Sequence, residues 1–247
     1  MMYPAILIFL TVSLVTNCEA WMPQAGQGGR LASAQLFPQR AAPWSFAIGG
    51  NNLYGDNEMR GAFGQLSHQN GSWGASTALS NESIDTIYQS VTWAAEGRTS
   101  FRNLFAWGRH EHRFHRIAGS TSFWTPESRI VLGMRASPVF SVATGIRKEN
   151  HCLLPDFGLE WNIGNTVQMD FYLTKSSQFI PWECTLGQSF AIAKGSSLEL
   201  GWGYPSKRIA FGLYWSTSSL AIETSQTYVS QLPPTNSGSC SFFARRE

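Results

Sequence analysis

The sequence predicts an all-β fold: a single antiparallel up-and-down transmembrane β-barrel of roughly 12 to 14 strands. Three observations predict it. Large apolar residues alternate with small or polar ones along most of the chain, turn residues separate the alternating runs, and the face opposite the apolar one carries mainly Gly, Ala, Ser and Thr. Only 14% of the 247 residues are charged, which is low for a soluble domain, where about 25% is typical.

The N-terminus has the pattern of a secretory signal. An apolar run covers residues 5–15, and Cys18-Glu19-Ala20 supplies the small residues that suit cleavage. We therefore expect a signal peptide over residues 1–20; an uncleaved anchor is the alternative, because no Lys or Arg precedes the apolar run. Residues 21–43 follow as an extended lead-in with one helical turn around Leu31 to Leu36, and residues 44–247 form the barrel domain.

Alternating runs follow one another along the barrel domain. Successive side chains of a strand point to opposite faces, and in chain order the apolar faces fall within residues 73–79, 87–95, 101–107, 130–134, 140–146, 157–163, 167–173 and 198–204. In the run 101–107 the apolar face consists of Phe101, Phe105 and Trp107. Because the apolar face of a membrane barrel turns to lipid, we expect these three residues on the outer wall.

The last two runs form a hairpin. Ile209, Phe211, Leu213 and Trp215 share one face, and after a Ser/Thr-rich connection Leu220 and Ile222 continue it. Turn residues bound this and the other runs, at 70–72, 96–98, 125–128, 163–165, 194–196 and 204–207. No segment between them has ten or more residues with a helical period.

A soluble, secreted β-sandwich that serves as a binding or surface-structural module is the alternative fold. Two features favour the barrel. The runs 165–175, 207–215 and 218–228 have the length of a membrane strand, which is about 9 to 11 residues. The small residues on the second face suit a crowded barrel interior. We expect Phe171 and Phe211 to contact lipid, and Asp170 and Glu199 to face the interior.

The order of patterns from Leu154 to Phe243 resembles the C-terminal half of small bacterial outer-membrane barrels of the FadL and PorV type. The resemblance rests on the turn Gly201 to Pro205, on Phe211-Gly212-Leu213 and on Ile222-Glu223. The resemblance implies that the barrel lies in the outer membrane, in contact with its lipid. It also implies one of two functions: passage of a small hydrophobic solute, or scaffolding of an envelope protein in a secretion or surface complex. The Asn-Pro-Ala signature of such families is missing, and a charged tail follows Phe243.

Nothing in the sequence indicates catalysis: it has no nucleophile elbow, phosphate loop, zinc-protease helix or paired-cysteine motif. We therefore predict a non-enzyme without catalytic, cofactor-binding or metal-binding residues. The net charge of +2 also gives no reason to expect nucleic acid as a partner. We expect Cys152, Cys184 and Cys240 to be unpaired small apolar residues; one disulfide with one free thiol is the alternative in an oxidising compartment.

Two groups of polar residues need an interpretation. The segment 109–116 holds His110, Glu111, His112 and His115, but His115 has the opposite parity and three arginines disfavour a cation, so a polar hairpin tip is expected rather than a metal site. The carboxylates on the small-residue face, Glu160, Asp170, Glu199 and Glu223, are expected to have a structural role inside the barrel rather than to select solutes.

Overall fold

The computed structural model describes residues 43–52, 59–84, 86–149, 152–164, 166–175, 182–230 and 232–244. The expected signal peptide and the lead-in with its helical turn lie outside the described residues, apart from Pro43 at the end of the lead-in. No helix within the described ranges is long and apolar enough to cross a membrane.

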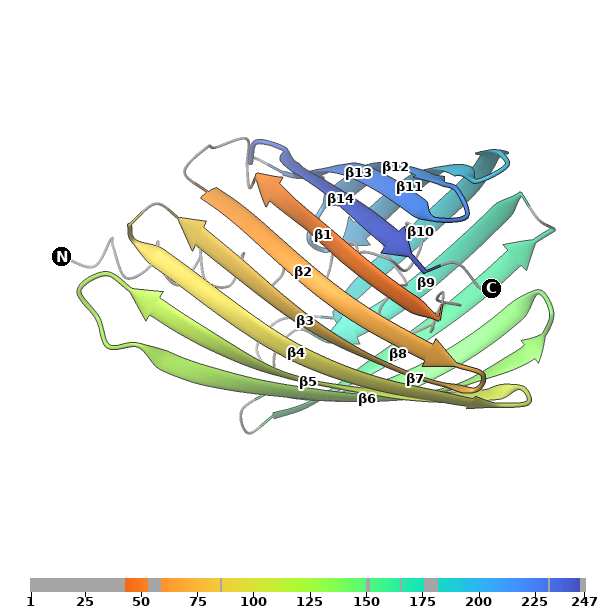
Figure 1. Cartoon of the computed structure of the whole chain (residues 1–247), viewed down its shortest axis with the longest axis horizontal. Helices are drawn as coiled ribbons and strands as arrows, with labels where there is room; N and C mark the ends of the chain where they lie inside the picture. The colour runs from red at the N-terminus through yellow and green to blue at the C-terminus, as the bar shows by residue number, and fades with distance from the viewer. Residues whose placement is uncertain are drawn as a thin grey trace.

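In the described residues, fourteen antiparallel strands form one closed barrel (Figure 1). Each strand pairs with its neighbours in sequence, and β1 pairs with β14 to close the ring through partners such as Ser45 and Phe243. This confirms the all-β, up-and-down barrel and rules out the sandwich. The strands are β1 (Trp44–Asn52), β2 (Met59–Asn70), β3 (Trp73–Ile84), β4 (Tyr88–Phe101), β5 (Leu104–Ile117), β6 (Phe123–Ser137), β7 (Phe140–Glu149), β8 (Cys152–Ile163), β9 (Val167–Lys175), β10 (Trp182–Ala193), β11 (Ser196–Tyr204), β12 (Arg208–Ser216), β13 (Leu220–Val229) and β14 (Thr235–Phe243).

The two ends of the barrel differ in the length of their connections. At the end where β1 starts and β14 finishes, which we call the turn end, only two or three residues join consecutive strands. Gly71, Gly164 and Gly195 have φ values of 56°, 64° and 77° there, a backbone region that glycine enters without steric cost. At the opposite end, the loop end, the connections have up to six residues.

Two predicted turns are wrong. Residues 96–98 lie within β4 and residues 125–128 lie within β6, because these strands are longer than the alternating runs indicated. Pro126 is tolerated in β6 because the β6–β7 ladder begins only at Glu127 and Glu149, so no ladder bond to β7 is lost at the proline. The predicted turns at 70–72, 163–165, 194–196 and 204–207 do connect strands.

The side chains divide into an apolar outer wall and a polar interior. Phe211 on the outer wall is 46% exposed, and large residues such as Leu79, Ile130 and Leu153 are still more exposed. Asp170 and Glu199 point to the interior, and each is 3% exposed. The faces predicted for Phe171, Phe211, Asp170 and Glu199 are therefore confirmed as outer and inner, respectively.

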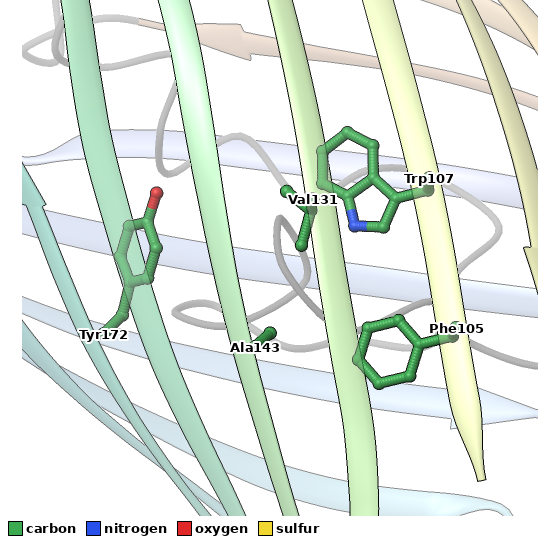
Figure 2. Close-up of a cluster of buried hydrophobic side chains, with 5 residues drawn as sticks. All are labelled: Phe105, Trp107, Val131, Ala143 and Tyr172. Carbon is green, nitrogen blue, oxygen red and sulfur yellow. The ribbon is translucent and has the colours of Figure 1, made fainter.

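Phe105 and Trp107 depart from the predicted faces, because both point to the interior and are buried. Figure 2 shows them beside Val131 of β6, with Ala143 of β7 and Tyr172 of β9 on the same inner face. The cause is the residue opposite Phe105, which is Gly133 on β6. A Cβ at Gly133 would lie only 2.0 Å from the Phe105 ring, so the missing side chain provides the space that the ring occupies.

Candidate functional site in the barrel interior

The interior surface has two chemically different halves. Strands β4 to β9 carry arginines, carboxylates and aromatic residues, and we call their inner face the charged wall. Strands β10 to β14 and β1 to β3 carry mainly small residues, and we call their inner face the small-residue wall. Its small buried members are Ser45, Ala47, Ser67, Thr185, Ala210, Ala221, Ser225, Ser239 and Ser241, and its larger buried members are Gln65, Glu82, Glu199, Arg208 and Glu223. In a ring of fourteen strands β5 lies seven places from β12 in either direction, so the two walls face each other across the barrel.

Arg129 is the centre of the charged wall. Its Nη2 lies 2.8 Å from Oδ2 of Asp156, and its Nε donates to the same oxygen at 2.9 Å. Arg129 also donates to the hydroxyl of Tyr172, and Thr174 donates to Oδ1 of Asp156. The guanidinium carbon lies 5.6 Å from the Trp107 ring centroid and 5.7 Å from that of Tyr172. These contacts tie β5, β6, β8 and β9 together inside the barrel.

Gly145 of β7 makes this cluster sterically feasible. Arg129 on β6 must pass over β7 to meet Asp156 on β8, and Gly145 is the direct register partner of Asp156. A Cβ at Gly145 would lie 2.8 Å from Cγ2 of Val131 and 3.7 Å from Cβ of Asp156. A side chain there would therefore compete with the cluster for space.

Glu111 lies between two arginines on the inner face of β5. Arg109 Nε donates to one of its carboxylate oxygens at 3.0 Å, and Arg113 Nη2 donates to the other at 3.0 Å. Arg147 Nε of β7 lies 3.7 Å from Glu127 Oε1 of β6, an ion pair without a hydrogen bond. Sequence reasoning missed these arginines as interior residues. The signal was present, because Arg109, Glu111 and Arg113 are spaced by two and must share one face of a strand.

Glu160 and Asp170 are satisfied by neighbouring amides. Gln168 Nε2 donates to Asp170 Oδ1 at 2.8 Å and to Glu160 Oε2 at 3.3 Å, and Asn162 donates to Glu160 Oε1 at 3.0 Å. These bonds hold the two carboxylates against the wall. Their geometry agrees with the structural role predicted for them.

Glu199 and Glu223 are carboxylates of the small-residue wall. Glu199 of β11 pairs in register with Gly212 of β12, and Gly212 pairs with Ser225 of β13, two residues from Glu223. Both carboxylates are buried, with 3% and 5% of their surface exposed. No hydrogen-bond partner of Glu223 Oε1 is found within the described part of the chain. Glu223 itself is the register partner of Tyr214, so the two carboxylates lie diagonally across β12, offset by two residues.

The histidine segment is not a hairpin tip, because residues 109–116 lie inside β5. The strand continues there because β6 extends far enough to pair with it, as far as His115 with Phe123. His110 and His112 point outward, with their Nε2 atoms 2.9 Å apart, whereas His115 points inward and bonds Tyr88 and Thr125. In the described residues, no group of three or more His, Cys, Asp or Glu could hold a metal ion.

Cysteines make no cross-link in the described part of the barrel. Cys152, Cys184 and Cys240 are free and half-buried, on three strands that do not neighbour one another in the ring. The ladder and the interior contacts therefore hold the described barrel without a disulfide.

Comparisons with known proteins show the fold. No protein-family model and no curated protein sequence matches the chain. Among solved structures, the chain is similar to the outer membrane protein Omp33 of Acinetobacter baumannii, with 10% identity and a TM-score of 0.59 over 82% of this chain and 98% of that chain. It is also similar to the CymD monoaromatic hydrocarbon channel, with 8% identity and a TM-score of 0.65 over 83% and 89% of the two chains. Both are outer-membrane barrels or channels; neither points to the FadL and PorV type in particular.

Proposed function

We propose that this chain is a non-enzymatic barrel of a bacterial outer membrane that passes a small polar solute through its interior. The apolar outer wall supports membrane insertion, because a closed barrel leaves no unpaired strand edge in lipid. Short turns at one end and longer loops at the other are typical of such barrels, so we assign the turn end to the periplasm. The likeness to Omp33 and CymD is consistent with this assignment.

The observation that carries the proposal is the unequal lining of the interior. The charged wall holds its side chains in place by hydrogen bonds and ion pairs, whereas the opposite wall consists mainly of Gly, Ala, Ser and Thr. Eight strands enclose just enough space for side chains, and 16 to 18 strands enclose an aqueous channel. Fourteen strands with one wall of small residues leave room for water and a small solute.

The lining also favours a polar solute over the hydrophobic one that the resemblance to FadL implied. A hydrophobic solute would have to displace water from arginines and carboxylates on the charged wall, and that desolvation is costly. A polar solute can exchange hydrogen bonds with the same groups. Ordered polar side chains such as Gln168 and Thr174 provide donors and acceptors for it.

The test is reconstitution of the purified protein into lipid bilayers. We expect extraction only with detergent, heat-modifiable migration on a gel, and stepwise single-channel conductance. In the same preparation, liposome swelling with sugars and amino acids of increasing size should exceed uptake of a fatty acid. A folded, inserted barrel with no conductance and no swelling would contradict passage, and a soluble monomer without detergent would contradict the membrane barrel.

A matched pair of variants separates passage through the interior from leakage around the barrel. Ser76→Trp places a large ring on the small-residue wall, at an interior position of β3. Gly64→Trp places the same ring on the outer wall, where nothing lies within 4 Å of a Cβ. We expect Ser76→Trp to lower the single-channel conductance and Gly64→Trp to leave it unchanged.

A hollow on the outer wall supports a second candidate function, the scaffolding of an envelope protein. The hollow has a volume of about 580 Å³ near the loop end and is lined by Gly50, Asn52, Arg60, Ala62, Asn81 and Asn236, among others. Gly50 and Asn52 continue the outer face of Phe46 and Ile48. Polar groups facing lipid are costly, and a protein partner would cover them. Site-specific photo-crosslinking from position 81 in intact cells, with position 130 on the apolar wall as control, would detect that partner.

A further inference from the structure

We propose that Glu199 and Glu223 form a cation-binding site on the small-residue wall, which makes the barrel prefer cationic over anionic solutes. The inference rests on the proposed passage through the interior and specifies the class of solute. It departs from the structural role expected for these two carboxylates from the sequence. The ligand class is a hydrated inorganic cation or the primary ammonium group of an organic solute.

The strand register places Glu199 and Glu223 near each other on the inner face of the barrel. Glu199 on β11 and Glu223 on β13 lie on either side of β12. Gly212 of β12 pairs with Glu199, and Tyr214, two residues further along β12, pairs with Glu223. Two strand spacings of about 9 to 10 Å and an offset of two residues along the strand, about 7 Å, separate the two backbone positions. Both side chains point to the interior, so their carboxylates can approach one ion from two sides. Gly212 has no side chain and leaves space beside Glu199, whereas Tyr214 borders Glu223 on the same inner face of β12.

Glu223 has a carboxylate oxygen without a hydrogen-bond donor among the described residues. This side chain is 5% exposed, and its Oε1 accepts no hydrogen bond from any described residue. Carboxylates of the charged wall differ: Glu111 accepts from Arg109 and Arg113, and Asp156 accepts from Arg129. A buried carboxylate without a donor is expensive. A cation from the solution would compensate that charge.

Acidic side chains are in excess on the inner face of β10 to β14. On the inner face of β10 to β14 the described charges are Glu183, Glu199 and Glu223 against Arg208. The arginines opposite are held by their own carboxylates in the pairs Arg109–Glu111, Arg113–Glu111 and Arg129–Asp156. On the described inner face of β10 to β14, where space is available, acidic side chains therefore outnumber basic ones by three to one. Walls of one sign concentrate ions of the opposite sign.

The chemistry of the site suits cations that prefer oxygen ligands. Two carboxylates and the backbone around Gly212 offer oxygen atoms and no soft ligand, which is typical of sites for Ca²⁺ and Mg²⁺. Tyr214 lies on the same inner face of β12 and is the register partner of Glu223. Its ring is close enough to the site to report on a bound lanthanide ion by sensitised luminescence.

The first test measures ion selectivity in planar bilayers under a KCl gradient. We expect a reversal potential that indicates preference for K⁺, and a decrease of at least about twofold in the K⁺/Cl⁻ permeability ratio for Glu223→Gln and for Glu199→Gln. Ser225→Ala, a neutral change beside Gly212, should leave the ratio unchanged. Glu183→Gln removes one charge elsewhere on the same wall and should have a smaller effect than Glu223→Gln. If Glu183→Gln lowered the permeability ratio as much as Glu223→Gln does, the result would overturn a specific site at Glu199 and Glu223.

The second test measures binding without conductance. Tb³⁺ added to the detergent-solubilised barrel should give saturable luminescence, which Glu223→Gln weakens and Glu199→Gln/Glu223→Gln abolishes, while Ser225→Ala retains it. Luminescence unchanged in the double variant would overturn the site. A conducting barrel without cation preference would contradict the inference and leave passage standing. Tb³⁺ binding at the two glutamates in a barrel that does not conduct would contradict passage and support the site.

Discussion

Arg129 and Asp156 form an ion pair that crosses over one strand of the barrel. Their side chains belong to β6 and β8, approach to 2.8 Å, and are 8% and 0% exposed. Strand β7 lies between them and contributes Gly145 at the crossing point. The pair thereby connects two strands that share no backbone ladder, and it does so inside the barrel rather than on its surface.

Replacing Arg129 by Met should destabilise the barrel by about 3 to 5 kcal/mol, because the buried Asp156 carboxylate would lose its counter-charge. Urea unfolding in detergent micelles, followed by tryptophan fluorescence, measures the change in free energy of unfolding. The double variant Arg129→Met/Asp156→Leu should be more stable than Arg129→Met alone, because no charge remains buried. Additive losses in the double variant would show that the two residues act independently.

The second prediction is that an arginine destabilises the barrel more on the outer wall than on the inner face. Phe211→Arg puts a charge on the outer wall and should cost about 2 to 4 kcal/mol in lipid. Ser225→Arg puts the same charge on the interior near Glu223 and should cost much less. Reversible folding into lipid vesicles at a series of urea concentrations gives both values. The reverse order of the two costs would mean that the inner and outer faces have been exchanged.

Much of the assignment of side chains to the outer and inner faces could be predicted from the alternation of apolar and polar residues along each strand. Asp170 and Phe171 are adjacent, so their opposite faces follow from the strand geometry alone, and the same holds for Glu199. Phe105 and Trp107 could not be assigned in this way, because an apolar residue turns inward only where a partner strand leaves space. That space comes from Gly133, which is 28 residues away in the chain and opposite Phe105 in register. The Arg129–Asp156 pair likewise depends on the register of three strands.

The contact between Phe105 and Gly133 is itself testable. Gly133→Ala would place a Cβ 2.0 Å from the Phe105 ring, and the strain should destabilise the barrel by about 1 to 3 kcal/mol. Shortening the ring in Gly133→Ala/Phe105→Leu should restore part of the loss. Gly97→Ala is the matched control, since nothing lies within 4 Å of its Cβ; thermal unfolding should separate the two alanine variants.

Trp107 provides the last prediction, which concerns the width of the passage. Its ring points to the interior beside Arg129 and is 7% exposed, whereas Trp93 on the outer wall is 45% exposed. Trp107→Ala should raise the single-channel conductance, because it removes a large side chain from the charged wall and uncovers the Arg129 guanidinium. Trp93→Ala removes the same volume from the outer wall and should leave conductance unchanged, although it should weaken insertion. The conductance of both variants is measured in the same bilayer composition, and their folding is checked by heat-modifiable migration. If a folded Trp107→Ala barrel conducts like the unaltered protein, the solute does not pass close to the charged wall, and its path is confined to the small-residue wall.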